Sequence, residues 1–198
     1  MILSSHIIVA SAAAASAVQA FNSKSSFLIF SVALASHYLL DIIPHWEYEL
    51  FSIDGFEDKE NDFSKIRMAF NIKNLLNDFL KLSFDFFAGL AAAWFLTKIF
   101  WPEFSFLYLT IAAGASVLPD VLQGFFIVFS PPPEADLPQA QKADQPLTEK
   151  GAMKKIFFPL YVFHLFFHSE FRLKKYPLLG FLFQMFIVGL IVALLTFF

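Results

Sequence analysis

Histidine and aspartate residues recur at helical spacing in an otherwise apolar chain. His37, Asp41 and His45 are four positions apart, so on a helix they share one face. His164 and His168 repeat this spacing later in the chain. Two side chains at i and i+4 can hold one metal ion between them. Because ionisable groups are costly within apolar spans, this pattern predicts a functional polar site.

The donor atoms of such a site are limited to nitrogen and oxygen, because the chain has no cysteine. Disulfides and thiolate metal sites are therefore excluded. Imidazole together with carboxylate suits a divalent metal ion, Zn first, with Mn, Fe or Mg as alternatives. Three residues from other apolar stretches can complete one site or two. The predicted ligands are His6, His37, Asp41, His45, Asp85, Asp120, His164 and His168.

Two kinds of hydrolytic centre are compatible with this set. Two ions about 4 Å apart would activate a water and stabilise the leaving oxygen of a phosphoester. A single catalytic ion would need three protein ligands and an open position. In either case a carboxylate beside the ion serves as general base, and the predicted catalytic residues are Asp41 and Asp120.

The elements that position these residues are predicted to be membrane helices. The chain has 198 residues, of which 58% are hydrophobic and 29 are phenylalanine. Only 16% are charged, against roughly 25% in ordinary soluble proteins. The mean hydropathy is +0.62. These values indicate an integral membrane protein, and a net charge of -3 gives no reason to expect a nucleic-acid partner.

Five segments are long and apolar enough to cross a bilayer, which takes roughly 20 residues. They are residues 2–21, 27–45, 75–100, 104–129 and 177–198. The first lacks the preceding basic residues of a signal peptide, so we expect it to remain as a helix. Residues 156–171 and 63–76 are shorter and suit interfacial helices. We therefore predict an all-α polytopic helical membrane protein with about five transmembrane helices and one or two interfacial helices.

This helical membrane domain is expected to be a single domain over residues 1–198. Residues 47–74 form an acidic, partly amphipathic connection, and the proline-rich residues 130–150 form a flexible loop. Eleven basic residues lie in 47–74 and 130–176, whereas the opposite side has only Lys24 and Lys98. Basic loops face the cytoplasm. We therefore expect a cytoplasmic N-terminus and cytoplasmic long connections.

This orientation places the polar residues in one layer. All five histidines and the carboxylates of Asp41, Asp85 and Asp120 fall in the cytoplasmic half of the membrane. His37 lies deepest, about 12 Å from His45 at 1.5 Å per residue. Pro44 is expected to end or bend the helix near His45. The layer favours one shared site at the cytoplasmic membrane face.

At these positions the chain resembles a prokaryotic group of small membrane-bound metal-dependent hydrolases. The likeness rests on His6, on Ser-His-Tyr-Leu-Leu-Asp-Ile-Ile-Pro-His at 36–45, on Asp85, on Leu-Pro-Asp-Val-Leu-Gln at 118–123 and on Phe-His-x3-His-Ser at 163–169. It covers most of the chain except 47–74 and 130–150. A more distant similarity is to zinc-dependent phospholipase C, which also uses dispersed histidines and aspartates on helices.

The resemblance implies a helical metal site formed by the eight predicted ligands and a location in the prokaryotic cytoplasmic (inner) membrane. The position of the site at the membrane face favours an ester or phosphoester of a lipid or amphiphile as substrate, with membrane lipid as partner. The group more often has four residues between its last two histidines, among them Arg and Thr. Here Leu165-Phe166-Phe167 separates them.

Each predicted ligand also has an ordinary structural interpretation. His6 alone would suit the membrane interface, Asp41 a helix cap, and Asp85 an ion pair with Lys81. Asp78 is interpreted as a solvated residue at the interface. The convergence of every histidine on one layer favours the shared site over these separate explanations.

Two other functions are compatible with the same residues. A metal-ion or proton transporter would use them as a path, and a non-catalytic structural protein would use them as interfacial anchors. A transport path needs polar groups across both halves of the membrane. The outer half offers only Ser and Thr, which favours a one-sided site. The sequence indicates no oligomeric state.

Overall fold

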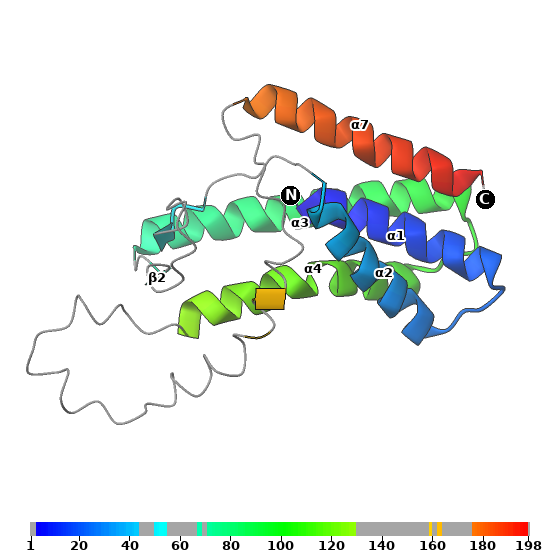
Figure 1. The fold of residues 1–198 in the computed structure, drawn as a ribbon, viewed down its shortest axis with the longest axis horizontal. Helices are drawn as coiled ribbons and strands as arrows, with labels where there is room; N and C mark the ends of the chain where they lie inside the picture. Colours follow the sequence, from blue (N-terminus) through cyan, green and yellow to red (C-terminus); the bar gives the residue numbers. More distant parts are fainter. Residues whose placement is uncertain are drawn as a thin grey trace, which may run out of the picture. The chain divides into compact units, whose positions relative to one another are not determined.

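Five helices and a small antiparallel strand pair make up the part of the chain that the structure, a computed structural model, describes. These residues are 3–43, 50–54, 67–68, 71–129, 159, 162–163 and 176–197. The helices are α1 (Leu3–Ala20), α2 (Ser26–Asp41), α3 (Ile72–Phe100), α4 (Phe106–Phe129) and α7 (Pro177–Thr196), and the strands are β1 (Ile53–Asp54) and β2 (Arg67–Met68) (Figure 1). The predicted all-α class is confirmed.

Four of these helices are long and apolar enough to cross a membrane: α1, α3, α4 and α7. α2 has 16 residues, or about 24 Å at 1.5 Å per residue, against a hydrocarbon core of about 30 Å. The four long helices suggest an integral membrane protein. The predicted number of five spans therefore stays a prediction, as does the side of the membrane that each connection faces.

The described residues belong to two compact units. The first comprises Met1–Tyr48, Lys81–Pro119 and Phe167–Phe198, and the second comprises Glu49–Leu80 and Asp120–Phe166. The expected single domain over residues 1–198 stays a prediction.

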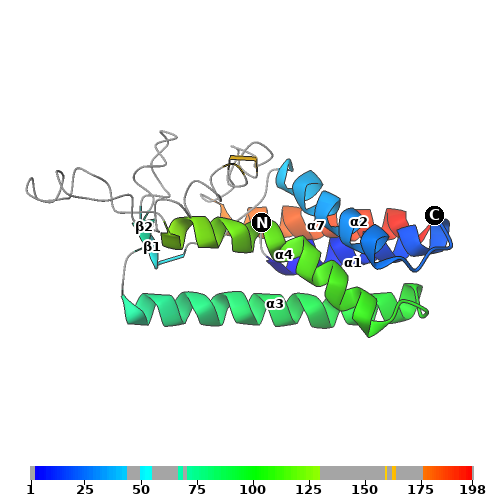
Figure 2. The ribbon, with the colours of Figure 1, turned by 90° about the horizontal axis from the view of Figure 1, so that it is seen from below.

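A tight turn joins α1 to α2 in the first unit. Asn22 has φ 46°, a left-handed conformation that asparagine tolerates better than most residues. The Ser23 amide donates to the Val18 carbonyl at 3.2 Å, and the Asn22 amide donates to the Gln19 carbonyl at 3.3 Å. These two bonds are the Schellman arrangement that closes a helix C-terminus. The turn brings α2 back along α1 as an antiparallel neighbour (Figures 1 and 2).

α1 is the most buried helix of the first unit and packs against both α2 and α7. Its buried positions are mostly small, with four alanines among its core residues. Small side chains let helix backbones approach closely inside a membrane. α1 also lies close to α3, where a methyl group added at Gly89 would lie 2.5 Å from Cα of Ser4. Gly89 is therefore required by the contact between α1 and α3.

In the second unit, β1 and β2 pair antiparallel with Ile53 opposite Met68. The expected helix over 63–76 is wrong at residues 67 and 68, which form β2, and its last residues belong to α3, which begins at Ile72. Residues 63–66 lie outside the described part of the chain. Asp78 is also not solvated as expected. Its side chain is 2% exposed, and its Oδ2 accepts a hydrogen bond from the Ser52 amide at 2.7 Å. This buried bond ties the chain before β1 to α3.

Candidate metal centre

Three of the predicted ligands, His6, His37 and Asp41, come together between α1 and α2. His37 and Asp41 are one turn apart on α2, as their spacing predicts. His6 is on α1, and the antiparallel hairpin brings it level with the end of α2. Their side chains are 1%, 0% and 2% exposed, so all three are buried. The hairpin therefore assembles a polar group within the apolar core.

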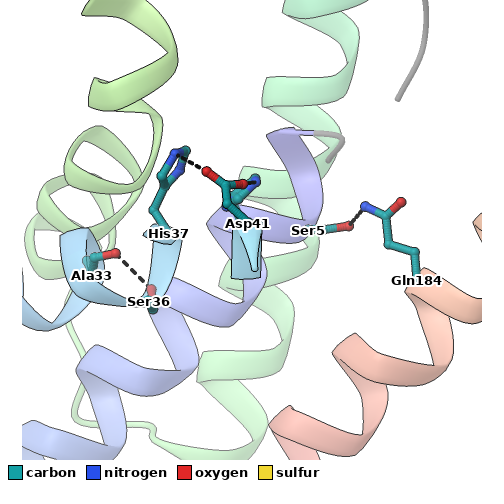
Figure 3. A network of polar contacts seen from close by, with 7 residues as sticks. Ser5, Ala33, Ser36, His37, Asp41 and Gln184 are labelled. Carbon is teal, nitrogen blue, oxygen red and sulfur yellow. Dashed lines mark hydrogen bonds and ion pairs between the residues drawn. The ribbon is translucent and has the colours of Figure 1, made fainter. Parts of the chain in front are cut away.

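The carboxylate of Asp41 lies between the two imidazoles. Nε2 of His6 is 3.3 Å from Oδ1, and Nε2 of His37 is 3.1 Å from Oδ2. The two rings are stacked, with centroids 4.3 Å apart and planes 30° from parallel. Figure 3 shows His37 and Asp41 pointing toward each other from adjacent turns of α2. Each carboxylate oxygen thus faces a different histidine.

This geometry fits a divalent ion. One candidate ligand atom from each residue can be chosen so that all three lie within 4.8 Å of one another. In a tetrahedral zinc site with bonds of about 2.0 Å, neighbouring ligand atoms are about 3.3 Å apart. The two nitrogen–oxygen distances, 3.3 Å to Oδ1 and 3.1 Å to Oδ2, lead to different carboxylate oxygens. The side chains would therefore move for one carboxylate oxygen and both ring nitrogens to hold the same ion. Within the part of the chain that the structure describes, these residues alone form such a group.

The electrostatic setting of Asp41 also favours a cation. Asp41 is the last residue of α2, and a helix C-terminus carries a partial negative charge. A buried carboxylate at that end is costly unless it is paired with positive charge or with hydrogen-bond donors. In addition, Nδ1 of His6 is buried and makes no hydrogen bond to any described residue. Ring nitrogens in this state commonly serve metal coordination or its supporting hydrogen bonds.

Of the other predicted ligands, the structure describes Asp85 and Asp120. Asp85, on α3, accepts a hydrogen bond from the Ser4 amide at 3.3 Å and is not a member of the close group. Asp120 is half-buried on α4 and belongs to the second unit. His45, His164 and His168 lie outside the described residues. The roles of these five as metal ligands, and those of Asp41 and Asp120 as catalytic residues, stay predictions.

A buried contact beside this group was not predicted. Nε2 of Gln184, on α7, donates to Oγ of Ser5 at 2.8 Å, and both side chains are at most 1% exposed. In the view of Figure 3 this pair lies on the opposite side of Asp41 from His37. The sequence feature that could have indicated this contact is Gln184 itself, a polar amide side chain within the charge-free apolar residues 177–198.

Comparison with known proteins adds no family to this description. No protein-family model matches the chain, and neither the curated proteins nor the solved structures contain a match. What stands is a helical protein with four apolar helices of membrane length and a buried group of two histidines and one aspartate that could hold a metal ion.

Proposed function

We propose that the chain is a membrane-embedded metal-dependent hydrolase of the prokaryotic cytoplasmic membrane. The observation that carries the proposal is the placing of the Asp41 carboxylate between His6 and His37, at 3.3 and 3.1 Å, inside an apolar helical core. The three residues hold one divalent ion, Zn before Mn, Fe or Mg, because imidazole and carboxylate are the ligand types that zinc accepts.

The number of ligands favours catalysis over a purely structural ion. Structural zinc sites are usually closed by four protein ligands, whereas catalytic sites have three and an open position. Among the residues that the structure describes, His6, His37 and Asp41 supply three. A bound divalent ion would contribute Lewis acidity toward an ester carbonyl or a phosphoryl oxygen. The apolar surroundings strengthen electrostatic interactions within the site, because little water screens them.

Asp41 provides the acid–base chemistry in this proposal. It would hold the ion through one carboxylate oxygen and accept a proton on the other. Its two oxygens face His6 and His37, at 3.3 and 3.1 Å. The substrate class is an ester or phosphoester of a lipid or amphiphile, since four helices are long and apolar enough to cross a membrane and the helices carry exposed phenylalanines.

The first experiment measures metal in the purified full-length chain by elemental analysis. We expect about one zinc per chain after purification in zinc-containing buffer, and less than about a tenth of this in a His6→Ala/His37→Ala variant. Ser116→Ala is the matched control. Ser116 is also fully buried, but its hydroxyl donates to the Ala113 carbonyl of its own helix at 2.9 Å. If the wild-type protein contains no more metal than the double variant, the proposal is wrong.

The second experiment measures hydrolysis. Zinc-loaded protein in lipid nanodiscs is incubated with a chromogenic acyl ester, a chromogenic phosphodiester and phospholipid. Turnover that disappears in the double variant and persists in Ser116→Ala supports a hydrolase. Metal binding without turnover, accompanied by zinc or proton flux in proteoliposomes, would instead assign the group to a transporter. Metal binding with neither activity would assign it a structural role.

A further inference from the structure

Three consecutive residues in the first turns of α1 contact three different helices. The Ser4 amide donates to Asp85 of α3, the Ser5 hydroxyl accepts from Gln184 of α7, and His6 faces Asp41 of α2. Successive residues of a helix point about 100° apart, so each can serve a different neighbour. The placing of His6 against Asp41 therefore depends on how the preceding two residues are held.

Asp85 of α3 helps to hold the start of α1 in place, because it accepts a hydrogen bond from the Ser4 backbone amide. Ser4 is the second residue of α1, and its amide is one of the four at a helix N-terminus that have no partner within the helix. Such amides need an acceptor when they are taken out of water. A carboxylate also interacts favourably with the partial positive charge of a helix N-terminus. Asp85 supplies both effects from a neighbouring helix.

Gly89 shows that this contact is close and specific. It is one turn after Asp85 on α3, and a methyl group at this position would lie 2.5 Å from Cα and 3.2 Å from the carbonyl oxygen of Ser4. On one face of α3, the Asp85 carboxylate thus accepts a hydrogen bond from the Ser4 amide, and Gly89, which has no side chain, leaves room for the Ser4 backbone. The first turn of α1 is fixed against α3 at two adjacent points.

We propose that Asp85 is a positioning residue rather than a metal ligand: it holds the first turn of α1 against α3 and thereby keeps His6 in place against Asp41. The effect on metal affinity rests on the proposed metal-binding function. The effect on α1 itself does not, because the Ser4–Asp85 bond and the Gly89 contact join protein atoms only.

The metal test compares two substitutions of Asp85 in the full-length chain. Asp85→Asn keeps an oxygen acceptor for the Ser4 amide, so its zinc affinity, measured by competition with a chromophoric chelator, should stay within about threefold of wild type. Asp85→Leu removes the acceptor and should weaken zinc binding by about tenfold or more, as loss of a supporting partner commonly does. The Co²⁺ absorption spectrum should shift in Asp85→Leu and be unchanged in Asp85→Asn.

Hydrogen exchange of the metal-free chain tests the positioning directly. Peptides covering the first turns of α1 should exchange at least about tenfold faster in Asp85→Leu than in wild type or Asp85→Asn, because the Ser4 amide and its neighbours lose their anchor. Thr97→Val is the matched control. It alters a buried hydroxyl on the same helix that donates to the Trp94 carbonyl, and it should leave α1 unaffected.

Three results would overturn the proposal. If Asp85→Asn loses zinc as completely as His37→Ala, Asp85 is a ligand. If Asp85→Leu alters neither exchange in α1 nor zinc affinity, Asp85 does not position His6. If exchange rises equally throughout α3 and α7, the substitution has damaged the whole unit. Wild-type protein that binds no zinc defeats the metal-binding proposal alone, and the exchange comparison still decides the role of Asp85.

Discussion

Nε2 of His6 lies 3.3 Å from Oδ1 of Asp41, so a residue near the start of α1 and the last residue of α2 contact each other directly. Both side chains are at most 2% exposed. A polar contact in this setting is costly to break on one side, because the remaining partner keeps its burial and loses its compensation. Asp41 makes this contact and a second one to His37, which makes it the central residue of the group.

Replacement of Asp41 by alanine should therefore destabilise the metal-free protein. The variant leaves two stacked buried imidazoles without their shared carboxylate, which should lower the free energy of unfolding by about 1–3 kcal/mol. Tryptophan fluorescence during heating in detergent follows this change. Ser36→Ala is the control on α2, since the Ser36 hydroxyl donates to the Ala33 carbonyl of its own helix. Equal losses in the two variants would contradict a special role for Asp41.

Zinc should stabilise the folded chain through the same three residues. At a free zinc concentration of 100 times Kd, a ligand that binds only the folded state adds about 2.7 kcal/mol to the free energy of unfolding. We expect a higher unfolding temperature on zinc addition and its reversal by a chelator. The His6→Ala/His37→Ala variant should show neither change. A zinc-dependent shift that persists in this variant would place the ion elsewhere.

Two glycine substitutions should change stability in opposite directions. Gly89→Ala introduces a methyl group 2.5 Å from Cα of Ser4, and the resulting overpacking should cost about 1–3 kcal/mol. A methyl group at Gly114, on α4, meets no atom within 4 Å. Gly114→Ala should therefore be neutral or stabilise by up to about 1 kcal/mol, because alanine favours the helix. The unfolding temperatures of the two variants test this difference. If Gly89→Ala is also neutral, the close contact between Gly89 and Ser4 is contradicted.

In the second unit, Asp78 should matter more than its neighbour Asn74. Asp78→Leu removes the buried acceptor of the Ser52 amide, whereas Asn74→Ala removes an exposed bond from Nδ2 to the Phe51 carbonyl. The buried Ser52 amide left without an acceptor costs about 1–3 kcal/mol, whereas the exposed Phe51 carbonyl can accept a hydrogen bond from water. Hydrogen exchange at residues 51–54 should accelerate strongly in Asp78→Leu and little in Asn74→Ala. If hydrogen exchange at residues 51–54 accelerates equally in the two variants, Asp78 does not matter more than Asn74.

The orientation inferred from the basic residues is testable because the natural chain has no cysteine. A single cysteine in place of Lys24, in the turn between α1 and α2, should react with a membrane-impermeant maleimide added to intact cells. A cysteine in place of Lys142 should react only after the cells are opened. The reverse pattern would invert the predicted topology and move the metal group to the outer half of the membrane.

The sequence was sufficient to predict the long helices, because their apolar stretches exceed the length that a bilayer requires. Their observed bounds differ from the predicted ones by at most a few residues, as for α7, predicted as 177–198 and found at Pro177–Thr196. The pairing of His37 with Asp41 also followed from spacing alone, since residues four apart share a helix face. α2 ends at Asp41, as expected from the proline at 44, which disfavours a helical conformation for Ile43.

The partners of several polar residues were not predictable from spacing. Asp85 was interpreted as a ligand or as a partner of Lys81, and its hydrogen bond from a backbone amide of α1 was not foreseen, because no sequence pattern records such a contact. Gln184 has no polar neighbour in its own span and meets Ser5 only because α7 packs on α1. Asp78 is buried by chain segments far from it in sequence. These contacts depend on which helices become neighbours, and periodicity within one helix does not carry that information.

The location of the three candidate ligands on α1 and α2 has a consequence for biosynthesis. His6, His37 and Asp41 all lie within one helical hairpin, so they leave the ribosome before any residue of α3 or α7. The three residues can therefore come near one another as soon as that hairpin forms. Asp85 and Gln184 are translated later, so the contacts that hold Ser4 and Ser5 form only when α3 and α7 pack on the hairpin. The final position of His6 against Asp41 is accordingly a late product of folding, although its residues are made early.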